Sequence, residues 1–292
     1  MRAGEAIDYQ VLARTFSRTA FRAMSEHSER PFADYARRLI PLTDCSAETT
    51  LAEAINCAYS TLASQYRNEY VYKNEIVSRL VFGRHSPRTA SVSLELRAGR
   101  SIADVVVCNG TTTAYEIKTE LDDFSRLAAQ LDDYSACFER IFVVTAAKFA
   151  DRAAAIAPSH VGVLTLGQGG RLSQVRPAST GLGRLSKGAV FGTLRRAEVL
   201  RVLKRAIDYE VDVPRSRLWA RTRELFLQIP IETVHAEAVH ELRHRGLSVA
   251  ALACAVPSPL RALAYEVPMR GKSVDRLLHR LDERVGSLAG SN

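Results

Sequence analysis

Residues 102–118 decide the fold, and they read Ile-Ala-Asp-Val-Val-Val-Cys-Asn-Gly-Thr-Thr-Thr-Ala-Tyr-Glu-Ile-Lys. The run 102–107 is largely apolar and rich in the β-branched residues that strands favour. The run 112–117 is a second strand-like segment, and Asn109-Gly110 between the two runs is a strong signal for a tight turn. The sequence therefore predicts a β-hairpin.

This hairpin carries three chemically important side chains, Asp104, Glu116 and Lys118. Pairing of the two strands is expected to bring Asp104 close to Glu116, because cross-strand neighbours lie side by side. The two-residue period of a strand places Glu116 and Lys118 on one face. Two carboxylates that can share a divalent cation, next to a lysine, form a recurring site for phosphodiester hydrolysis.

The wider pattern resembles the PD-(D/E)XK nuclease superfamily. Residues 66–74 (Tyr-Arg-Asn-Glu-Tyr-Val-Tyr-Lys-Asn) precede the hairpin, and residues 115–122 (Tyr-Glu-Ile-Lys-Thr-Glu-Leu-Asp) close it, as in a branch of largely uncharacterised bacterial proteins. The bare D-x(n)-E-x-K spacing is weak, but an acidic helix upstream and a glutamine helix downstream strengthen it. Ala103 stands where the superfamily's name has proline, which is not a ligand.

The resemblance implies a Mg²⁺ (or Mn²⁺) cofactor held by Asp104, Glu116 and the backbone carbonyl of Ile117. Lys118 is then expected to orient the attacking water and to offset negative charge on the phosphate. The structural alternative is a surface aspartate with a Glu-Lys pair on a sheet edge, where charges protect against aggregation.

An upstream helix acid completes the pattern, and Glu69 is the first candidate. It lies seven residues before Ile76 and so on the same face as the helix's apolar stripe, whereas Glu75 shares a face with Arg79. Glu75 is the second candidate. The alternative for Glu69 is an acid paired with a neighbouring basic side chain, Arg67 or Lys73.

Gln130 and Tyr134 lie four residues apart on the helix expected after Lys118, so they share a face. The resemblance implies that the glutamine reaches towards the site. An ordinary surface glutamine and a core tyrosine remain the alternative.

The predicted fold class is α/β, with a PD-(D/E)XK nuclease-like core (αβββαβ, a mixed sheet flanked by helices) and helical N- and C-terminal extensions. Three segments are expected: a helical segment 1–65, the nuclease-like domain 66–178 and a basic helical domain 179–292. Predicted helices span 6–24, 31–40, 48–66, 69–82, 122–138, 194–207, 215–228, 231–245 and 273–288. Predicted strands span 91–96, 102–108, 112–117, 140–145, 161–166 and 171–175.

Positive charge is concentrated in one part of the chain. Residues 171–230 carry thirteen Lys and Arg against five Asp and Glu, which accounts for the whole net charge of +8. Such a region suits the phosphate backbone of nucleic acid, most simply DNA, although a solvated helix face is the alternative. Leu200, Leu203 and Ile207 predict an apolar stripe on the helix at 194–207. The candidate nucleic-acid contacts are Arg67, Lys73, Arg84, Arg195, Arg196, Arg201, Lys204 and Arg205.

The composition is that of a globular protein, with 47% hydrophobic and 25% charged residues among 292. No apolar run approaches the roughly 20 residues of a membrane span, and the N-terminus lacks a signal peptide's apolar core. Five widely spaced cysteines without a C-x-x-C pair indicate reduced thiols. We therefore expect a cytoplasmic protein with no membrane partner, and homodimerisation is left open.

His240-Glu241-Leu242-Arg243-His244 matches H-E-x-x-H, the helix motif of zinc proteases. Glu266 is a conceivable third ligand. The surrounding helix is strongly charged, which disfavours a buried zinc site, and histidines on a basic face that contact phosphate are the preferred interpretation.

Together these patterns predict a Mg²⁺-dependent (deoxyribo)nuclease, endonuclease or exonuclease, in a setting such as phage defence, a mobile element or DNA repair. The alternatives are a non-catalytic nucleic-acid-binding module that retains the fold and, third, a zinc hydrolase built on His240, Glu241 and His244.

Overall fold

The computed structural model describes residues 8–27, 33, 35–36 and 45–290. These residues form two compact units, which are treated separately. The helical unit comprises Met1–Ser78, Gln168–Gly170 and Val249–Asn292, and the sheet unit comprises Arg79–Gly167 and Arg171–Ser248. The three-segment division expected from the sequence stays a prediction.

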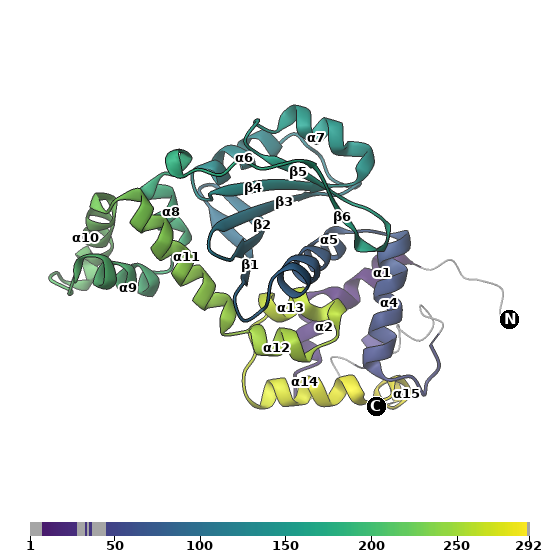
Figure 1. Cartoon of the computed structure of the whole chain (residues 1–292). Coiled ribbons are helices and arrows are strands. Elements are labelled where there is room, and N and C mark those ends of the chain that lie inside the picture. The colour runs from purple at the N-terminus through teal and green to yellow at the C-terminus, as the bar shows by residue number, and fades with distance from the viewer. Residues whose placement is uncertain (1–7, 28–32, 34, 37–44, 291–292) are drawn as a thin grey trace. The chain divides into compact units, whose positions relative to one another are not determined.

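The sheet unit is built on six strands in the order β1-β2-β3-β4-β5-β6. β1, β2 and β3 are antiparallel, β3, β4 and β5 are parallel, and β6 returns antiparallel to β5. This mixed sheet, flanked by helices, confirms the α/β class (Figure 1). The strands are Ser91–Ala98 (β1), Ser101–Cys108 (β2), Thr112–Lys118 (β3), Arg140–Thr145 (β4), Gly162–Leu166 (β5) and Leu172–Arg176 (β6).

The predicted hairpin between β2 and β3 is confirmed. Its register pairs Val105 with Tyr115 and Cys108 with Thr112. Gly110 adopts φ +75°, a left-handed conformation that glycine reaches without steric cost. The Asn-Gly turn thus fixes the register on which the relative positions of the acidic side chains depend.

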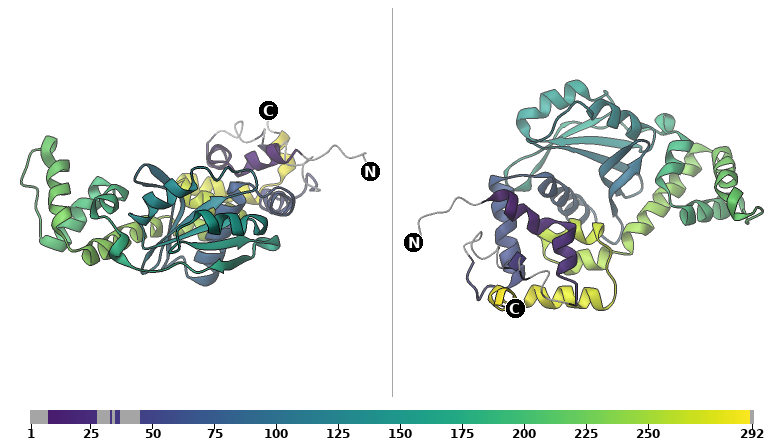
Figure 2. Two further views of the ribbon diagram at one scale, coloured as in Figure 1. Left: turned by 90° about the horizontal axis from the view of Figure 1, so that it is seen from above. Right: turned by 180° about the vertical axis from the view of Figure 1, so that it is seen from behind.

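Helices α6 and α7 cover one face of this sheet, and α8 and α11 contact β1, with α9 and α10 packed against them (Figures 1 and 2). A continuous apolar core joins Leu131 of α6, Val106 of β2 and Phe226 of α10. The helices are Leu127–Ser135 (α6), Ala150–Ile156 (α7), Lys187–Thr193 (α8), Arg196–Ile207 (α9), Arg215–Gln228 (α10) and Ile231–Leu247 (α11). Short 3₁₀ turns lie at Ala147–Phe149 and Leu182–Arg184.

The helical unit is made of short helices around buried side chains such as Leu12, Phe21, Leu62 and Tyr72. The predicted helix 31–40 falls almost wholly outside the described residues. The helices are Tyr9–Ala13 (α1), Arg18–Ala23 (α2), Leu51–Gln65 (α4), Glu69–Ile76 (α5), Ala250–Ala255 (α12), Arg261–Glu266 (α13), Lys272–Asp282 (α14) and Val285–Gly290 (α15). Short 3₁₀ turns occur at Arg14–Phe16, Gln168–Gly170 and Ser258–Leu260, and α5 runs on into a π-helical segment, Val77–Arg84.

One difference from the expected elements has a local cause. The helix predicted from residue 122 begins only at Leu127, because the Asp122 carboxylate accepts from the Thr119 amide at 2.7 Å and the Thr119 hydroxyl at 2.6 Å. Such side-chain bonds to the backbone hold a turn in place of a helix. Helices α7, α8, α12 and α13 were not expected from the sequence. Within the described ranges, none of the helices combines the length and apolar content that crossing a membrane requires.

Candidate functional site

The hairpin and helix α6 together build the candidate site. The register that pairs Val105 with Tyr115 brings Asp104 level with Glu116, one step further along the two strands. Residues opposite each other in a sheet point to the same face, so both carboxylates lie on one side. Ala114, on the same face as Glu116, belongs to the core that also contains Leu131 of α6. This is therefore the face that α6 covers.

Glu116 and Lys118 form a buried ion pair, with Lys118 Nζ 2.9 Å from Glu116 Oε1. The same ammonium donates to Oε1 of Gln130 at 2.9 Å. The Tyr134 hydroxyl lies 2.6 Å from Glu116 Oε2 and 2.6 Å from the carbonyl of Ile102, so its single proton is shared between two acceptors. The structure thus brings together four of the residues singled out in the sequence, and Gln130 reaches the lysine as expected.

Asp104 joins this group through the backbone of β3. Its Oδ2 accepts a hydrogen bond of 2.7 Å from the amide of Ile117, the residue between Glu116 and Lys118. The carboxylate is half-buried, whereas Glu116 is 1% exposed. A negative charge held by a backbone donor at the more exposed side of the group is positioned for an incoming cation.

Burial controls the electrostatics of the group. It raises the pKa of the Glu116 carboxyl above its usual value, although Lys118 and the hydroxyl of Tyr134 oppose the shift. Burial, together with the neighbouring Glu116, also raises the pKa of the Tyr134 hydroxyl far above its usual value. Tyr134 therefore keeps its proton and acts as a hydrogen-bond donor.

The donor chemistry of this group suits a hard divalent cation. Asp104 and Glu116 offer carboxylate oxygens, and each such oxygen has two lone pairs. Mg²⁺ takes one or two carboxylates and keeps several waters, so it does not require a full protein cage. In the part of the chain that the structure describes, no three His, Cys, Asp or Glu side chains are grouped to hold a metal. The ligand role of the Ile117 carbonyl stays a prediction.

One distortion next to this group was not expected from the sequence. Glu95 has φ +52°, a conformation that non-glycine residues rarely adopt. It lies between the pairs Leu94–Val105 and Leu96–Ala103 of the β1–β2 ladder, directly across from Asp104. Strained residues of this kind concentrate at functional sites, but they cannot be predicted from a sequence pattern.

The two helix-acid candidates lie on α5, in the helical unit. Glu69 is 51% exposed and pairs with Lys73 at 2.6 Å, so the expectation that Glu69 points inwards is wrong. It is the first residue of the helix, where the face continuing from Ile76 is not covered. Glu75 instead accepts from the hydroxyl of Tyr59 at 2.9 Å. A contribution of either acid to the carboxylate group stays a prediction.

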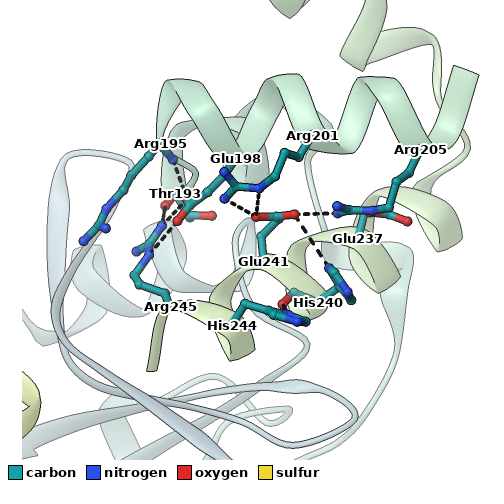
Figure 3. A network of polar contacts seen from close by, with 10 residues as sticks. All are labelled: Thr193, Arg195, Glu198, Arg201, Arg205, Glu237, His240, Glu241, His244 and Arg245. Atoms are coloured by element: carbon teal, nitrogen blue, oxygen red, sulfur yellow. Dashed lines mark hydrogen bonds and ion pairs between the residues drawn. The ribbon is translucent and has the colours of Figure 1, made fainter. Parts of the chain in front are cut away.

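The H-E-x-x-H residues form a different arrangement (Figure 3). Glu241 is 2% exposed and accepts from Arg201 and Arg205, each at 2.6 Å. Burial acts to raise its pKa, but the hydrogen bonds from the arginines hold that pKa below the usual value. His244 Nδ1 lies 2.9 Å from the carbonyl of His240, and the two rings are in contact at a tilt of 41°. Glu266, the conceivable third ligand, pairs with Arg18 in the helical unit.

The candidate nucleic-acid contacts divide into paired and unpaired cations. Besides Arg201 and Arg205, Lys204 pairs with Asp208 at 2.7 Å and Glu210 at 3.0 Å. These ion pairs lower the charge that the three cations can offer to phosphate. Lys73, on α5, is buried. Arg195 and Arg196, in contrast, are exposed, and their guanidinium groups have no acidic partner in the described ranges.

Arg84 lies in a separate pocket on the other face of the sheet. This pocket of about 230 Å³ also contains Arg140 and the stacked rings of Tyr115 and Phe142. Tyr115 and Glu116 are adjacent in β3 and therefore point to opposite faces. The pocket is thus distinct from the carboxylate group.

Comparison with known proteins gives one family. A family profile described as bacteriophage P4 protein cII matches residues 62–249, more than half of the chain. Protein cII of Enterobacteria phage P4 is 30% identical over 99 residues, which are 33% of this chain and 38% of that protein. The similar region therefore spans well under half the length of the relative. No solved structure is significantly similar to the chain.

Proposed function

The chain belongs to the family of bacteriophage P4 protein cII, and we propose that its sheet unit is a Mg²⁺- or Mn²⁺-dependent nuclease that acts on DNA. One observation carries the proposal. The Lys118 ammonium is held 2.9 Å from both Glu116 and Gln130, on the sheet face where Asp104 also lies. Two carboxylates and an amide-positioned lysine are the side chains that metal-assisted hydrolysis of a phosphodiester requires.

Each side chain has a separate role in this proposal. A Mg²⁺ held here would act as a Lewis acid on the scissile phosphate and lower the pKa of a coordinated water. Asp104 and Glu116 would supply the anionic oxygens that hold the cation, with the carbonyl of Ile117 as the expected third donor. Lys118 donates a hydrogen bond from its ammonium to the phosphate oxygen on which charge builds up, and it orients the attacking water. Gln130 fixes the direction of that ammonium.

Tyr134, on α6, donates a hydrogen bond that holds the Glu116 carboxylate in place. Because its hydroxyl stays protonated, it donates to Oε2 and leaves Oε1 for the lysine. A neutral donor at this position helps to keep the buried carboxylate ionised, which is the form that binds a cation.

A second function is favoured by a different observation. Glu116 is 1% exposed, and its two oxygens contact Lys118 and Tyr134. This is also the arrangement expected if the Glu116–Lys118 ion pair only stabilises the fold. On this alternative the protein binds nucleic acid without cleaving it.

A cleavage panel separates the two functions. Linear, nicked, branched and single-stranded DNA and the matching RNA are incubated with the full chain in Mg²⁺, Mn²⁺ or EDTA. The nuclease proposal expects cleavage of at least one DNA substrate with either metal and none in EDTA. Binding of these substrates without cleavage under any metal condition favours the non-catalytic module.

A further inference from the structure

A pocket outside the carboxylate group lies between α9 and α10. It has a volume of about 340 Å³, and it is lined by Arg196, Leu200, Arg215, Leu218, Trp219 and Thr222. Small-molecule sites usually measure about 300–1,000 Å³, so this pocket has room for one compact group. Its walls combine two cations, two leucines and an aromatic ring.

Trp219 is the only tryptophan of the chain and is 37% exposed. The guanidinium of Arg196 lies 5.5 Å from the centre of its ring, within cation–π range. Phe191 packs against the same indole with a ring separation of 4.4 Å and is itself buried. The indole is thus supported from the core while part of it faces solvent.

The arginines of the basic region differ in whether they form ion pairs. On α10, Arg221 pairs with Asp212 and with Glu224, both at 3.2 Å. In the described part of the chain, Arg196 and Arg215 have no acid within ion-pair distance. The pocket therefore holds uncompensated positive charge next to an aromatic ring.

We propose that this pocket binds an unpaired nucleotide of single-stranded nucleic acid. The base lies against Trp219 between Leu200 and Leu218, while Arg196 and Arg215 bind the phosphates on either side of it. Base–aromatic stacking beside a basic groove is the general mode of single-strand binding. The exposed cation–π contact of Arg196 is weak, so the base displaces the guanidinium from the ring and the guanidinium moves to phosphate.

A neighbouring side chain favours a strand over a free nucleotide. Arg195 directly precedes Arg196, is exposed, and has no acidic partner for its guanidinium among the described residues. It extends the positive surface beyond the volume that one nucleotide fills, where the next phosphate of a strand is expected. A paired base in a duplex presents no free face to the indole.

This binding site requires no metal and no cleavage, so it is tested in EDTA, separately from the proposed nuclease activity. The intrinsic fluorescence of the single tryptophan reports occupancy directly. A deoxythymidine oligomer of about 12 nucleotides is titrated into the full chain, beside an equal-length duplex and the mononucleotide dTMP. The proposal expects quenching by the oligomer at concentrations about 10-fold or more below those needed with either other ligand.

Variants then assign the contacts, with fluorescence anisotropy of a labelled oligomer as the readout. Trp219→Ala should weaken binding by about 10-fold, as loss of one stacked base does elsewhere. Arg196→Ala/Arg215→Ala retains the indole and should reduce both the affinity and its salt dependence. Arg221→Ala is the matched control, because it removes one arginine of α10 that is ion-paired and outside the pocket. Its affinity should stay within about 2-fold of the unaltered chain.

Three results would overturn the proposal. One is an oligomer that binds without quenching the indole, and another is equal quenching by duplex or by dTMP. The third is an affinity of Arg196→Ala/Arg215→Ala equal to that of Arg221→Ala. Because both arginines are exposed, the double variant is expected to fold, so the test does not depend on the stability of Trp219→Ala.

Discussion

Replacing Lys118 with methionine should destabilise the sheet unit, because it leaves the Glu116 carboxylate without its counter-ion. Both side chains are almost fully buried, with 8% of the lysine and 2% of the glutamate exposed, and their charged atoms are 2.9 Å apart. Breaking a buried ion pair by removing one partner costs about 3–5 kcal/mol. We expect the lower end of that range, since Tyr134 still donates to Glu116 and the carboxyl can take up a proton.

The cost should depend on pH in a defined direction. Burial already raises the pKa of Glu116, and loss of the lysine raises it further. The folded state then holds a proton that the unfolded state has released. Stability of Lys118→Met should consequently fall as pH rises from the carboxyl's ordinary value, about 4.3, to its raised value in the folded state.

Combining Lys118→Met with Glu116→Gln should restore most of the lost stability. A buried ion pair replaced by uncharged groups of similar size is often as stable as the original or more so. We expect the double variant to lie within about 1 kcal/mol of the unaltered chain, so its loss should be well below the sum of the two single losses.

Urea unfolding followed by Trp219 fluorescence measures these values in the sheet unit, where the single tryptophan lies. The series is run at pH 5 and pH 8. A destabilisation by Lys118→Met that is equal at both pH values would refute the reasoning. So would a double variant whose loss equals the sum of the two single losses.

Four further variants test three separate parts of the account. Tyr134→Phe removes a donor that lowers the pKa of Glu116, so the rise of metal-dependent cleavage with pH should move to higher pH. Glu241→Gln should cost about 2 kcal/mol at neutral pH in urea unfolding. The folded-state pKa of Glu241 is lowered, so that contribution is lost as pH falls through it and the two chains should converge in acid. Arg196→Glu should flatten the salt dependence of DNA binding more than Lys204→Glu, whose cation is already ion-paired.

Each of these expectations has a contrary result. An unmoved pH profile would mean that Tyr134 does not tune the carboxylate. If Glu241→Gln lowers the free energy of unfolding by the same amount in acid as at neutral pH, the charge of Glu241 is not the source of that stability. Equal salt slopes for the two charge reversals would mean that ion pairing does not decide which cations meet phosphate.

The hairpin could be predicted because its signals are local. The Asn109-Gly110 turn and the β-branched runs act over a few residues, and the two-residue period of a strand then places Glu116 and Lys118 on one face. The reach of Gln130 followed from the resemblance together with helical spacing. These features need no knowledge of what packs against the element.

Features that depend on distant partners could not be predicted. The stripe expected from Leu200, Leu203 and Ile207 was wrong in part, because α9 buries Val199, Val202 and Leu203 against the core and leaves Ile207 exposed. The choice of buried face is made by the neighbouring helices. In the same way, charge counts cannot show that Arg201 pairs with Glu241, forty residues further along the chain.

The most direct test of the central claim compares the unaltered chain with Glu116→Ala in single-turnover cleavage. Both proteins are purified identically, checked for equal folding by circular dichroism, and incubated with the same DNA in Mg²⁺ and in EDTA. The account predicts metal-dependent cleavage by the unaltered chain, and its loss in Glu116→Ala with DNA binding largely retained. Cleavage by Glu116→Ala at the rate of the unaltered chain would contradict the assignment of the catalytic site.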